Sequence, residues 1–357
     1  MCLAHSPVVD AFAAEAQLPP FAAGLIDTIN KAGTAMSLSI GHRLGLFDAM
    51  RDQPARTSAE WADKLSLDPR YMAEWLGAMT AAGIVHIDEE ARYSLPAEHA
   101  LFLGEDAPAG SMTGMMQWVG VLAPVESEIV SCFRKGGGVP YSSYPRFHDV
   151  MEEEGKLTFD ADATLGLSDG LVERLEQGID VLDVGCGRGR ALRIYAERFP
   201  NSRFVGYDLS NDAIATARQN AANLPNLRFE VLDCMKMDDA DAFDLIFTFD
   251  AIHDQPHPLT LLCNIRRALR EDGLYIGQDI WAHTEVADNR DHPLGPFIYT
   301  ISLMHCMTVS LAQGGEGLGA AWGEEKAFEL FAEAGFASVE MHRLEHDMQN
   351  AYYVCRP

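Results

Sequence analysis

The sequence predicts an α/β domain with a doubly wound parallel sheet in its second half, preceded by a small helical domain that ends in a two-stranded wing. The first observation is the apolar run 181–184, which leads into glycines spaced Gly-x-Gly-x-Gly and then into a helical stretch at 190–199. Strand, tight turn and helix in this order open a βαβ unit. The second is a series of further strand-like runs, at 203–207, 229–233, 243–249 and 274–279. The chain then closes with two segments, 338–344 and 351–355, that predict a terminal antiparallel hairpin.

The third observation is the pattern of residues 1–95, which predicts a winged-helix domain. Apolar residues recur at helical spacing from Phe21 to Met50, and Gly41 and Gly45 mark a break. The segments that follow are a helix opened by the capping box Thr57–Glu60, a second helix that starts at Asp68-Pro69, and two short strands at 84–87 and 92–95. At 357 residues the chain is long for one hydrophobic core, so we expect a second, larger domain at 165–357.

A winged helix suggests DNA binding, but the charges of this chain argue against it. The formal net charge is -26, and recognition helices place cations against phosphates and base edges. Here Arg70 is flanked by Asp68 and Glu74, and the wing tip carries acids at 88–90. We therefore predict a packing and dimerisation module and no nucleic-acid partner.

Composition also predicts the cellular compartment of the protein. The seven cysteines form no Cys-x-x-Cys pair, so neither a disulfide framework nor a zinc module is predicted. The first twenty residues lack a basic start followed by an apolar run, and no stretch has about 18 uninterrupted apolar residues. We expect a cytoplasmic protein without a membrane partner.

The glycine motif decides the class of ligand. A dinucleotide fingerprint needs its third glycine where Arg190 stands, and Gly189 comes one position early, which disfavours a Rossmann oxidoreductase. The next strand ends in Asp208, about 25 residues after Asp183, where an acid can chelate a ribose diol. The spacing predicts a ligand with a ribose and without a pyrophosphate.

Four motifs in order resemble those of the class I S-adenosylmethionine-dependent methyltransferases: 183–189, 206–210, 229–234 and 243–249. The resemblance covers residues 165–357 and implies a Rossmann-like sheet and S-adenosyl-L-methionine as the cofactor. In that family the glycine loop holds the methionine part, the acid at Asp208 holds both ribose hydroxyls, and Asp233 with Cys234 borders the adenine. The implied cofactor-binding residues are Asp183, Gly185, Cys186, Gly187, Gly189, Asp208, Leu209, Asp233, Cys234 and Phe249.

A second resemblance concerns the acceptor side. Small-molecule O-methyltransferases of the plant caffeate type and their bacterial relatives carry a winged-helix domain that builds a homodimer, and a His-Asp-Trp stretch after the fourth strand supplies their base. His253-Asp254 resembles that stretch, which implies a catalytic role, although Gln255 replaces the tryptophan and no orienting carboxylate is identifiable. A histidine that only packs in this loop is the alternative. The histidines match no metal signature, so no metal is predicted.

Substrate contacts are predicted outside the sheet. Residues 96–164 are interpreted as a helical connector and active-site lid, in which Tyr141 and Tyr144 lie on a loop. His305 lies on a helical run, 297–311, within a long insertion after the fifth strand. The prediction is thus methyl transfer from S-adenosylmethionine to a small-molecule acceptor, most plausibly at a hydroxyl. A regulator that binds S-adenosylmethionine without turnover is the alternative.

Overall fold

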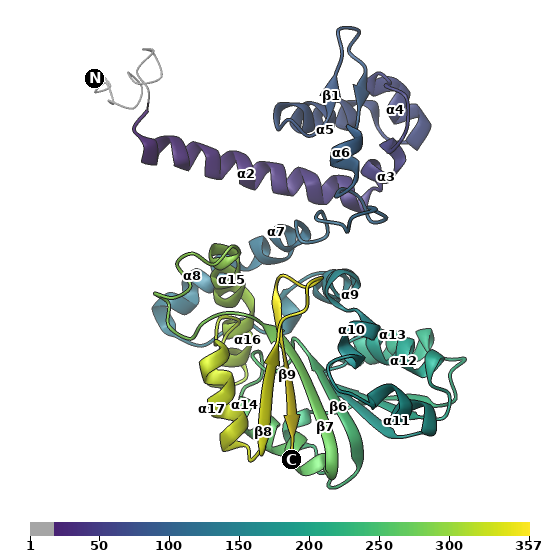
Figure 1. Cartoon of the computed structure of the whole chain (residues 1–357). Coiled ribbons are helices and arrows are strands. Elements are labelled where there is room, and N and C mark those ends of the chain that lie inside the picture. Colours follow the sequence, from purple (N-terminus) through teal and green to yellow (C-terminus); the bar gives the residue numbers. More distant parts are fainter. Residues whose placement is uncertain (1–17) are drawn as a thin grey trace. The chain divides into compact units, whose positions relative to one another are not determined.

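The computed structural model describes residues 18–357, and the chain divides into two compact units, Met1–Gly120 and Val121–Pro357 (Figure 1). This division lies inside the stretch 96–164 that the sequence analysis assigned to a connector. The difference has a physical reason, because Ala100 is buried in the core of the first unit and Leu103 and Met116 pack against that core. The later part of the stretch is hydrogen-bonded within the second unit, for example from Val139 N to Thr308 Oγ1 at 2.9 Å.

The first unit has the predicted winged-helix order. Its elements are α2 (Pro20–Arg43), α3 (Leu46–Met50), α4 (Ser58–Leu65), α5 (Pro69–Ala81), β1 (His86–Ile87), β2 (Tyr93–Ser94) and α6 (Ala97–Ala100), followed by α7 (Gln117–Leu122) at the division. The capping box at Thr57 and Glu60 is present, and Asp68 caps α5. The helix break falls at Gly45 (φ 64°), whereas Gly41 lies inside α2. Gly41 is needed for packing, since a Cβ there would lie 2.6 Å from the ring of Trp75.

The second unit contains the predicted sheet, with strand order β5-β4-β3-β6-β7-β9-β8. The strands are β3 (Asp180–Val184), β4 (Arg203–Asp208), β5 (Leu227–Val231), β6 (Phe243–Phe249), β7 (Leu269–Ile280), β8 (Ser338–His342) and β9 (Asn350–Arg356). Strands β3 to β7 pair in parallel, and β9 is antiparallel to both β7 and β8. The doubly wound class with a terminal antiparallel hairpin is therefore confirmed.

Helices cover both faces of this sheet, as Figure 1 shows. One buried cluster joins the sheet to α14 and α17, and the other joins it to α11, α12 and α13. The helices of this unit are η1 (Ala123–Val125), α8 (Glu126–Lys135), η2 (Tyr141–Ser143), α9 (Phe147–Thr158), α10 (Ala161–Leu165), α11 (Leu171–Gln177), α12 (Arg190–Arg198), α13 (Asn211–Asn220), η3 (Cys234–Lys236), α14 (Pro258–Ala268), α15 (Gly295–Ile301), η4 (Ser302–Cys306), α16 (Met307–Ala312) and α17 (Glu324–Glu333).

The helical run α15–η4–α16 contains a π-helical turn at η4. Its 18 residues, Gly295–Ala312, are long and apolar enough to cross a membrane by length and composition alone, and 44% of the segment is buried inside the protein. A π turn inserts one residue into the helical repeat and is frequent at functional sites. Here it turns the consecutive residues His305 and Cys306 into the interior, where both are buried.

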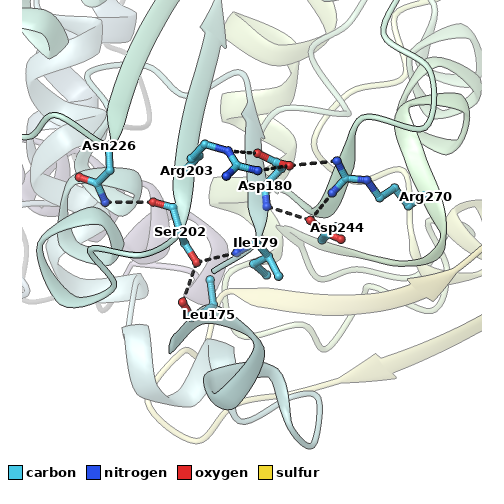
Figure 2. A network of polar contacts seen from close by, with 8 residues as sticks. All are labelled: Leu175, Ile179, Asp180, Ser202, Arg203, Asn226, Asp244 and Arg270. Carbon is cyan, nitrogen blue, oxygen red and sulfur yellow. Dashed lines mark hydrogen bonds and ion pairs between the residues drawn. The ribbon is translucent and has the colours of Figure 1, made fainter. Parts of the chain in front are cut away.

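A charged network ties the strands together at the amino edge of the sheet, opposite the edge where ligands bind in doubly wound folds (Figure 2). Asp180 accepts two hydrogen bonds from Arg203, at 2.6 and 2.7 Å, and one from Arg270 at 2.9 Å. Arg270 also pairs with Asp244, and Asp244 accepts from the amide of Asp180 at 2.8 Å. The network thus joins β3, β4, β6 and β7 through the first or second residue of each strand.

Candidate functional site

A cavity of about 130 Å³ opens at the carboxyl edge of the sheet. It lies at the switch point between β3 and β6, where the strand order reverses. Its walls come from the glycine loop after β3, from the end of β6 and from α9: the lining residues are His148, Met151, Glu152, Glu154, Gly155, Thr158, Phe159, Asp183, Gly185, Cys186, Gly187, Arg188, Arg190, Ala191, Phe249, Asp250 and Gln278. Of the predicted cofactor residues, the cavity thus brings together Asp183, Gly185, Cys186, Gly187 and Phe249.

The glycine loop has the backbone that its sequence requires. Gly185, Gly187 and Gly189 have φ values of 79°, 52° and 71°, in the left-handed region that side chains disfavour. A Cβ on Gly189 would also lie 2.2 Å from the ring of Phe229, so this glycine lets α12 begin close to the sheet. Gly189 lies outside the lining of the cavity, and its predicted contact with the cofactor stays a prediction.

The other predicted cofactor residues lie at neighbouring strand ends. Asp208, the last residue of β4, accepts hydrogen bonds from Gly187 N and Ser210 N, both at 2.8 Å, and Leu209 beside it is 56% exposed. Asp233 caps η3 and pairs with Lys236, and Cys234 is buried behind the loop. Asp208 thus holds the glycine loop in place, and its contact with a ribose stays a prediction.

The carboxylates of Asp183 and Asp250 line the cavity. Oδ1 of each makes no hydrogen bond within residues 18–357. Burial first, and the nearby Asp208 second, raise the pKa of Asp183 to about 8. Burial likewise raises the pKa of Asp250 well above its ordinary value. The cavity is therefore suited to a ligand that brings positive charge.

Sequence reasoning missed Asp250, although it follows β6 directly. Its backbone is strained, with φ at 50°, and its Oδ2 accepts from Gln278 Nε2 at 3.1 Å. A non-glycine residue in the left-handed region at a cavity wall is a sign of a functional constraint. The signal available in the sequence was its place at the carboxyl end of a central strand.

Helix α9 closes one side of the cavity through charge. Arg188 of the glycine loop pairs with Asp149 at 2.7 Å and with Glu152 at 2.9 Å, two acids three residues apart on the same face of α9. Because Glu152 also lines the cavity, this ion pair links the loop to its cover. These contacts come from residues that the sequence analysis placed in the lid.

The predicted catalytic residue His253 lies between two carboxylates just past β6. Its Nδ1 is 2.6 Å from Asp279 Oδ1, and its Nε2 is 3.2 Å from Asp254 Oδ1. Asp279 Oδ1 also accepts from Ile280 N at 2.8 Å and from Trp322 Nε1 at 3.2 Å, which fix the carboxylate. Asp279 is the orienting carboxylate that the sequence did not reveal, and it stands near the end of the neighbouring strand β7.

The two carboxylates control the charge of this histidine. Burial alone lowers the pKa of His253, but Asp279 and Asp254 outweigh burial and raise the pKa well above its ordinary value. The two contacts differ in kind. Nδ1 is hydrogen-bonded to Asp279 Oδ1, whereas Oδ1 of Asp254 has no hydrogen-bond partner among the described residues, so its approach to Nε2 is a charge contact only.

The predicted substrate residues Tyr141, Tyr144 and His305 do come together, around Asp254. Tyr141 OH donates to Asp254 Oδ2 at 2.8 Å, and His305 Nδ1 lies 3.7 Å from the same oxygen. Tyr144 OH donates to the carbonyl of Met304 at 2.5 Å, within the π-helical turn. Phe147, which the sequence did not indicate, stacks on His305 with 4.3 Å between ring centroids. This aromatic cap covers His253 and Asp254, which are 2% and 6% exposed.

Two family models match the chain. Residues 32–105 match the Rv2258c-like winged HTH domain, and residues 175–317 match a methyltransferase domain. The trans-aconitate 2-methyltransferase of Deinococcus radiodurans is 35% identical over 112 residues, which are 31% of this chain and 39% of that protein. The chain thus spans about two fifths of the length of this curated relative.

Solved structures share the fold over nearly the whole chain. Human N-acetylserotonin methyltransferase, solved in complex with S-adenosylmethionine, superposes with a TM-score of 0.71 at 17% identity and covers 96% of this chain and 99% of its own. The mitomycin 7-O-methyltransferase MmcR gives 0.69 at 13% identity, with coverage of 99% and 100%. At these identities the likeness concerns the fold. The two domain matches go further and show a methyltransferase domain preceded by a winged HTH domain.

Proposed function

We propose that this protein transfers the methyl group of S-adenosylmethionine to a hydroxyl of a small molecule. The observation that carries the proposal is the pair His253–Asp279, with 2.6 Å between Nδ1 and Oδ1. Neither residue lines the cavity, but each is close in sequence to one that does: His253 follows Asp250 by three positions, and Asp279 follows Gln278 directly. A histidine oriented by a carboxylate is a typical general base.

The residues of the cavity fit the cofactor. S-adenosylmethionine carries an ammonium group and a sulfonium, and Asp183 and Asp250 each offer a carboxylate oxygen that has no hydrogen-bond partner in the described chain. When bound, it supplies an electrophilic methyl group. The glycine loop lets the ligand approach the backbone closely, and Asp208, at the end of the next strand, is the residue that we propose for the ribose.

Within this proposal the protein contributes position and one proton acceptor. An acceptor hydroxyl that binds Nε2 of His253 takes the place of Asp254 Oδ1, which leaves the imidazole paired with Asp279 alone. Losing one of its two carboxylate partners lowers the pKa of His253 relative to the closed cluster, so the ring can accept the hydroxyl proton. Tyr141 and His305 remain as polar partners for the displaced Asp254.

A hydroxyl fits this site better than a carboxylate does. A carboxylate acceptor is already ionised at neutral pH and needs no base, whereas an alcohol or phenol is neutral and gains from one. The relative from Deinococcus radiodurans is named for an acidic acceptor, trans-aconitate, so acids belong in the test. The experiment is to incubate the protein with S-adenosylmethionine labelled in its methyl group and a panel of phenols, alcohols and carboxylic acids. Labelled methyl ethers support the proposal and methyl esters contradict its hydroxyl part, while binding of the cofactor without any transfer favours a regulator.

The cofactor should displace a proton from Asp183. The pKa of this carboxyl is about 8 in the structure, so it is mostly protonated at pH 7. A ligand ammonium favours its ionised form, and binding of S-adenosylhomocysteine at pH 7 should release close to one proton. Calorimetry in two buffers of different ionisation enthalpy measures this release directly. Affinity should rise with pH by up to about tenfold per unit between pH 6 and 8, and level off above 8.

The matched control is Asp183→Asn, which keeps the shape of the side chain and removes its titration. Proton release at pH 7 should disappear in this variant, and its affinity should no longer rise between pH 6 and 8. Release that persists in Asp183→Asn would assign the proton to another group and remove Asp183 from the proposed cofactor site.

We further propose that the protein is a homodimer through its first unit. Helix α2 exposes apolar side chains at helical spacing along most of its length: Phe21 79%, Leu25 57%, Ile29 69%, Met36 54% and Ile40 48%. Such a stripe on a solvent-facing helix is typical of an interface. Leu25→Glu with Ile29→Glu should convert the dimer to a monomer in sedimentation velocity, because two charges would enter the apolar contact. Tyr71→Glu, on α5 and 81% exposed, is the control that should stay dimeric.

A further inference from the structure

We infer that His253, Asp254 and Cys306 form a binding site for a divalent transition-metal ion of the zinc type. This differs from the expectation of no metal, which rested on the absence of a sequence signature. The three residues come from two distant segments, the loop after β6 and the π-helical turn η4, and no local spacing reveals them. Their ligand atoms all lie within 4.8 Å of one another, and all three residues are buried.

The histidine is already arranged as a metal ligand. Metal-binding histidines almost always give their second nitrogen to a carboxylate or carbonyl, which fixes the ring. Asp279 holds Nδ1 at 2.6 Å in this way and leaves Nε2 directed at the cluster, 3.2 Å from Asp254 Oδ1. Zinc bonds to nitrogen and oxygen are each about 2.0–2.2 Å long, so two tetrahedral ligand atoms lie roughly 3.4 Å apart. The existing separation therefore accommodates an ion with little movement.

The π-helical turn supplies the sulfur. Cys306 is 3% exposed and is the last residue of η4, and His305 before it has its Nδ1 3.7 Å from Asp254 Oδ2. Both side chains of the turn thus reach the same carboxylate. Open zinc sites have three protein ligands and a fourth coordination position for another ligand. Here the fourth position would lie near His305.

Charge and ligand type select the ion. Binding requires the Cys306 thiol, whose pKa burial raises to about 12, to release its proton to solvent, and it requires Nε2 of His253 to be unprotonated. The resulting thiolate and the carboxylate of Asp254 then neutralise the two positive charges of the ion. Sulfur and imidazole favour zinc and other late transition metals over magnesium and calcium. The second candidate group, His283 with Glu324 and Glu325, has no thiolate and is partly exposed. It therefore lacks the features that distinguish the buried cluster.

The site has a consequence for the proposed function, and this part of the inference rests on that function. A metal at Nε2 of His253 occupies the nitrogen that would take the hydroxyl proton. Zinc should therefore inhibit methyl transfer, and a chelator should restore it. Metal binding itself requires neither cofactor nor acceptor, so the two proposals fail independently.

The test uses cobalt as a spectroscopic substitute for zinc in the full-length, metal-free protein. Co²⁺ should bind with a stoichiometry of one and give a thiolate-to-cobalt charge-transfer band, which zinc should abolish by displacement. Cys306→Ser should lose this band. Cys263→Ser is the matched control, since Cys263 is an exposed cysteine on α14 and its variant should keep the band. Asp279→Asn should keep the band and weaken the binding of zinc about 10–100-fold.

Three results would overturn the inference. They are no charge-transfer band in the wild-type protein, a band that survives Cys306→Ser, and a band that disappears in Cys263→Ser. If Cys306→Ser does not fold, as judged by circular dichroism, Asp254→Asn replaces it, and this variant should weaken cobalt while retaining a weaker thiolate band. Unchanged cobalt affinity in Asp254→Asn would equally contradict the site.

Discussion

Replacing His253 by alanine is expected to lower methyl transfer to a hydroxyl acceptor by about 10²–10⁴-fold, with cofactor affinity unchanged. The loss follows from the removal of the proton acceptor that Asp279 orients. The cofactor is unaffected because the carboxylates that face its cavity, Asp183 and Asp250, are left in place. Single-turnover rates with saturating S-adenosylmethionine measure the first quantity, and calorimetry measures the second.

The matched control is His257→Ala, in the same loop. His257 is exposed and pairs with the surface residue Glu316 at 3.2 Å, so its variant should keep full turnover. The turnover of Asp279→Asn should lie between those of His253→Ala and His257→Ala, since this variant keeps the imidazole but removes its charged partner. Full turnover in His253→Ala would reduce this histidine to a packing residue. An equal loss of turnover and cofactor affinity would place it in the cofactor site.

Asp208→Ala is expected to weaken binding of S-adenosylhomocysteine by at least about tenfold. Hydrogen bonds to a charged acceptor contribute about 1.5–3 kcal/mol each, and the ribose diol offers two. The structure adds a second cause, because Asp208 also accepts from the amide of Gly187 and so holds the glycine loop. The measured loss therefore combines a direct and an indirect effect.

A ligand that lacks one ribose hydroxyl separates these effects. The wild-type protein should bind S-adenosylhomocysteine more tightly than its 2′-deoxy analogue, and Asp208→Ala should bind both with similar affinity. This would be the coupling expected between a carboxylate and the hydroxyl it contacts. If the variant still prefers the ribose to the same extent, Asp208 acts only on the loop.

The fold and the cofactor loop were predictable because their signals are local. The run at 181–189 contains the strand, the turn and the glycines whose positive φ values the structure requires, all within nine residues. The capping box at Thr57 and Glu60 is equally local. The fold class was predictable for the same reason, because the strand signals that predict it are also local in the sequence.

The catalytic environment was less predictable because it is assembled over long distances in the chain. Asp279 lies 26 positions from His253, and Tyr141 lies 113 positions from Asp254. Only the order of strands places such residues together, since β6 and β7 are neighbours whose carboxyl ends meet. Cys306 depends in addition on a π-helical turn, which no hydrophobic periodicity indicates.

The charged network at the amino edge of the sheet affects which substitutions this protein can tolerate. Asp180, Arg203 and Arg270 hold the strands together through contacts that involve none of the residues lining the cavity. Loops at the carboxyl edge can therefore accept substitutions that alter acceptor choice, while strand register is maintained from the other end. Proteins with this arrangement can acquire new substrates while the sheet keeps its strand pairing. Directed evolution of this chain should therefore concentrate on the loops after β6 and β7.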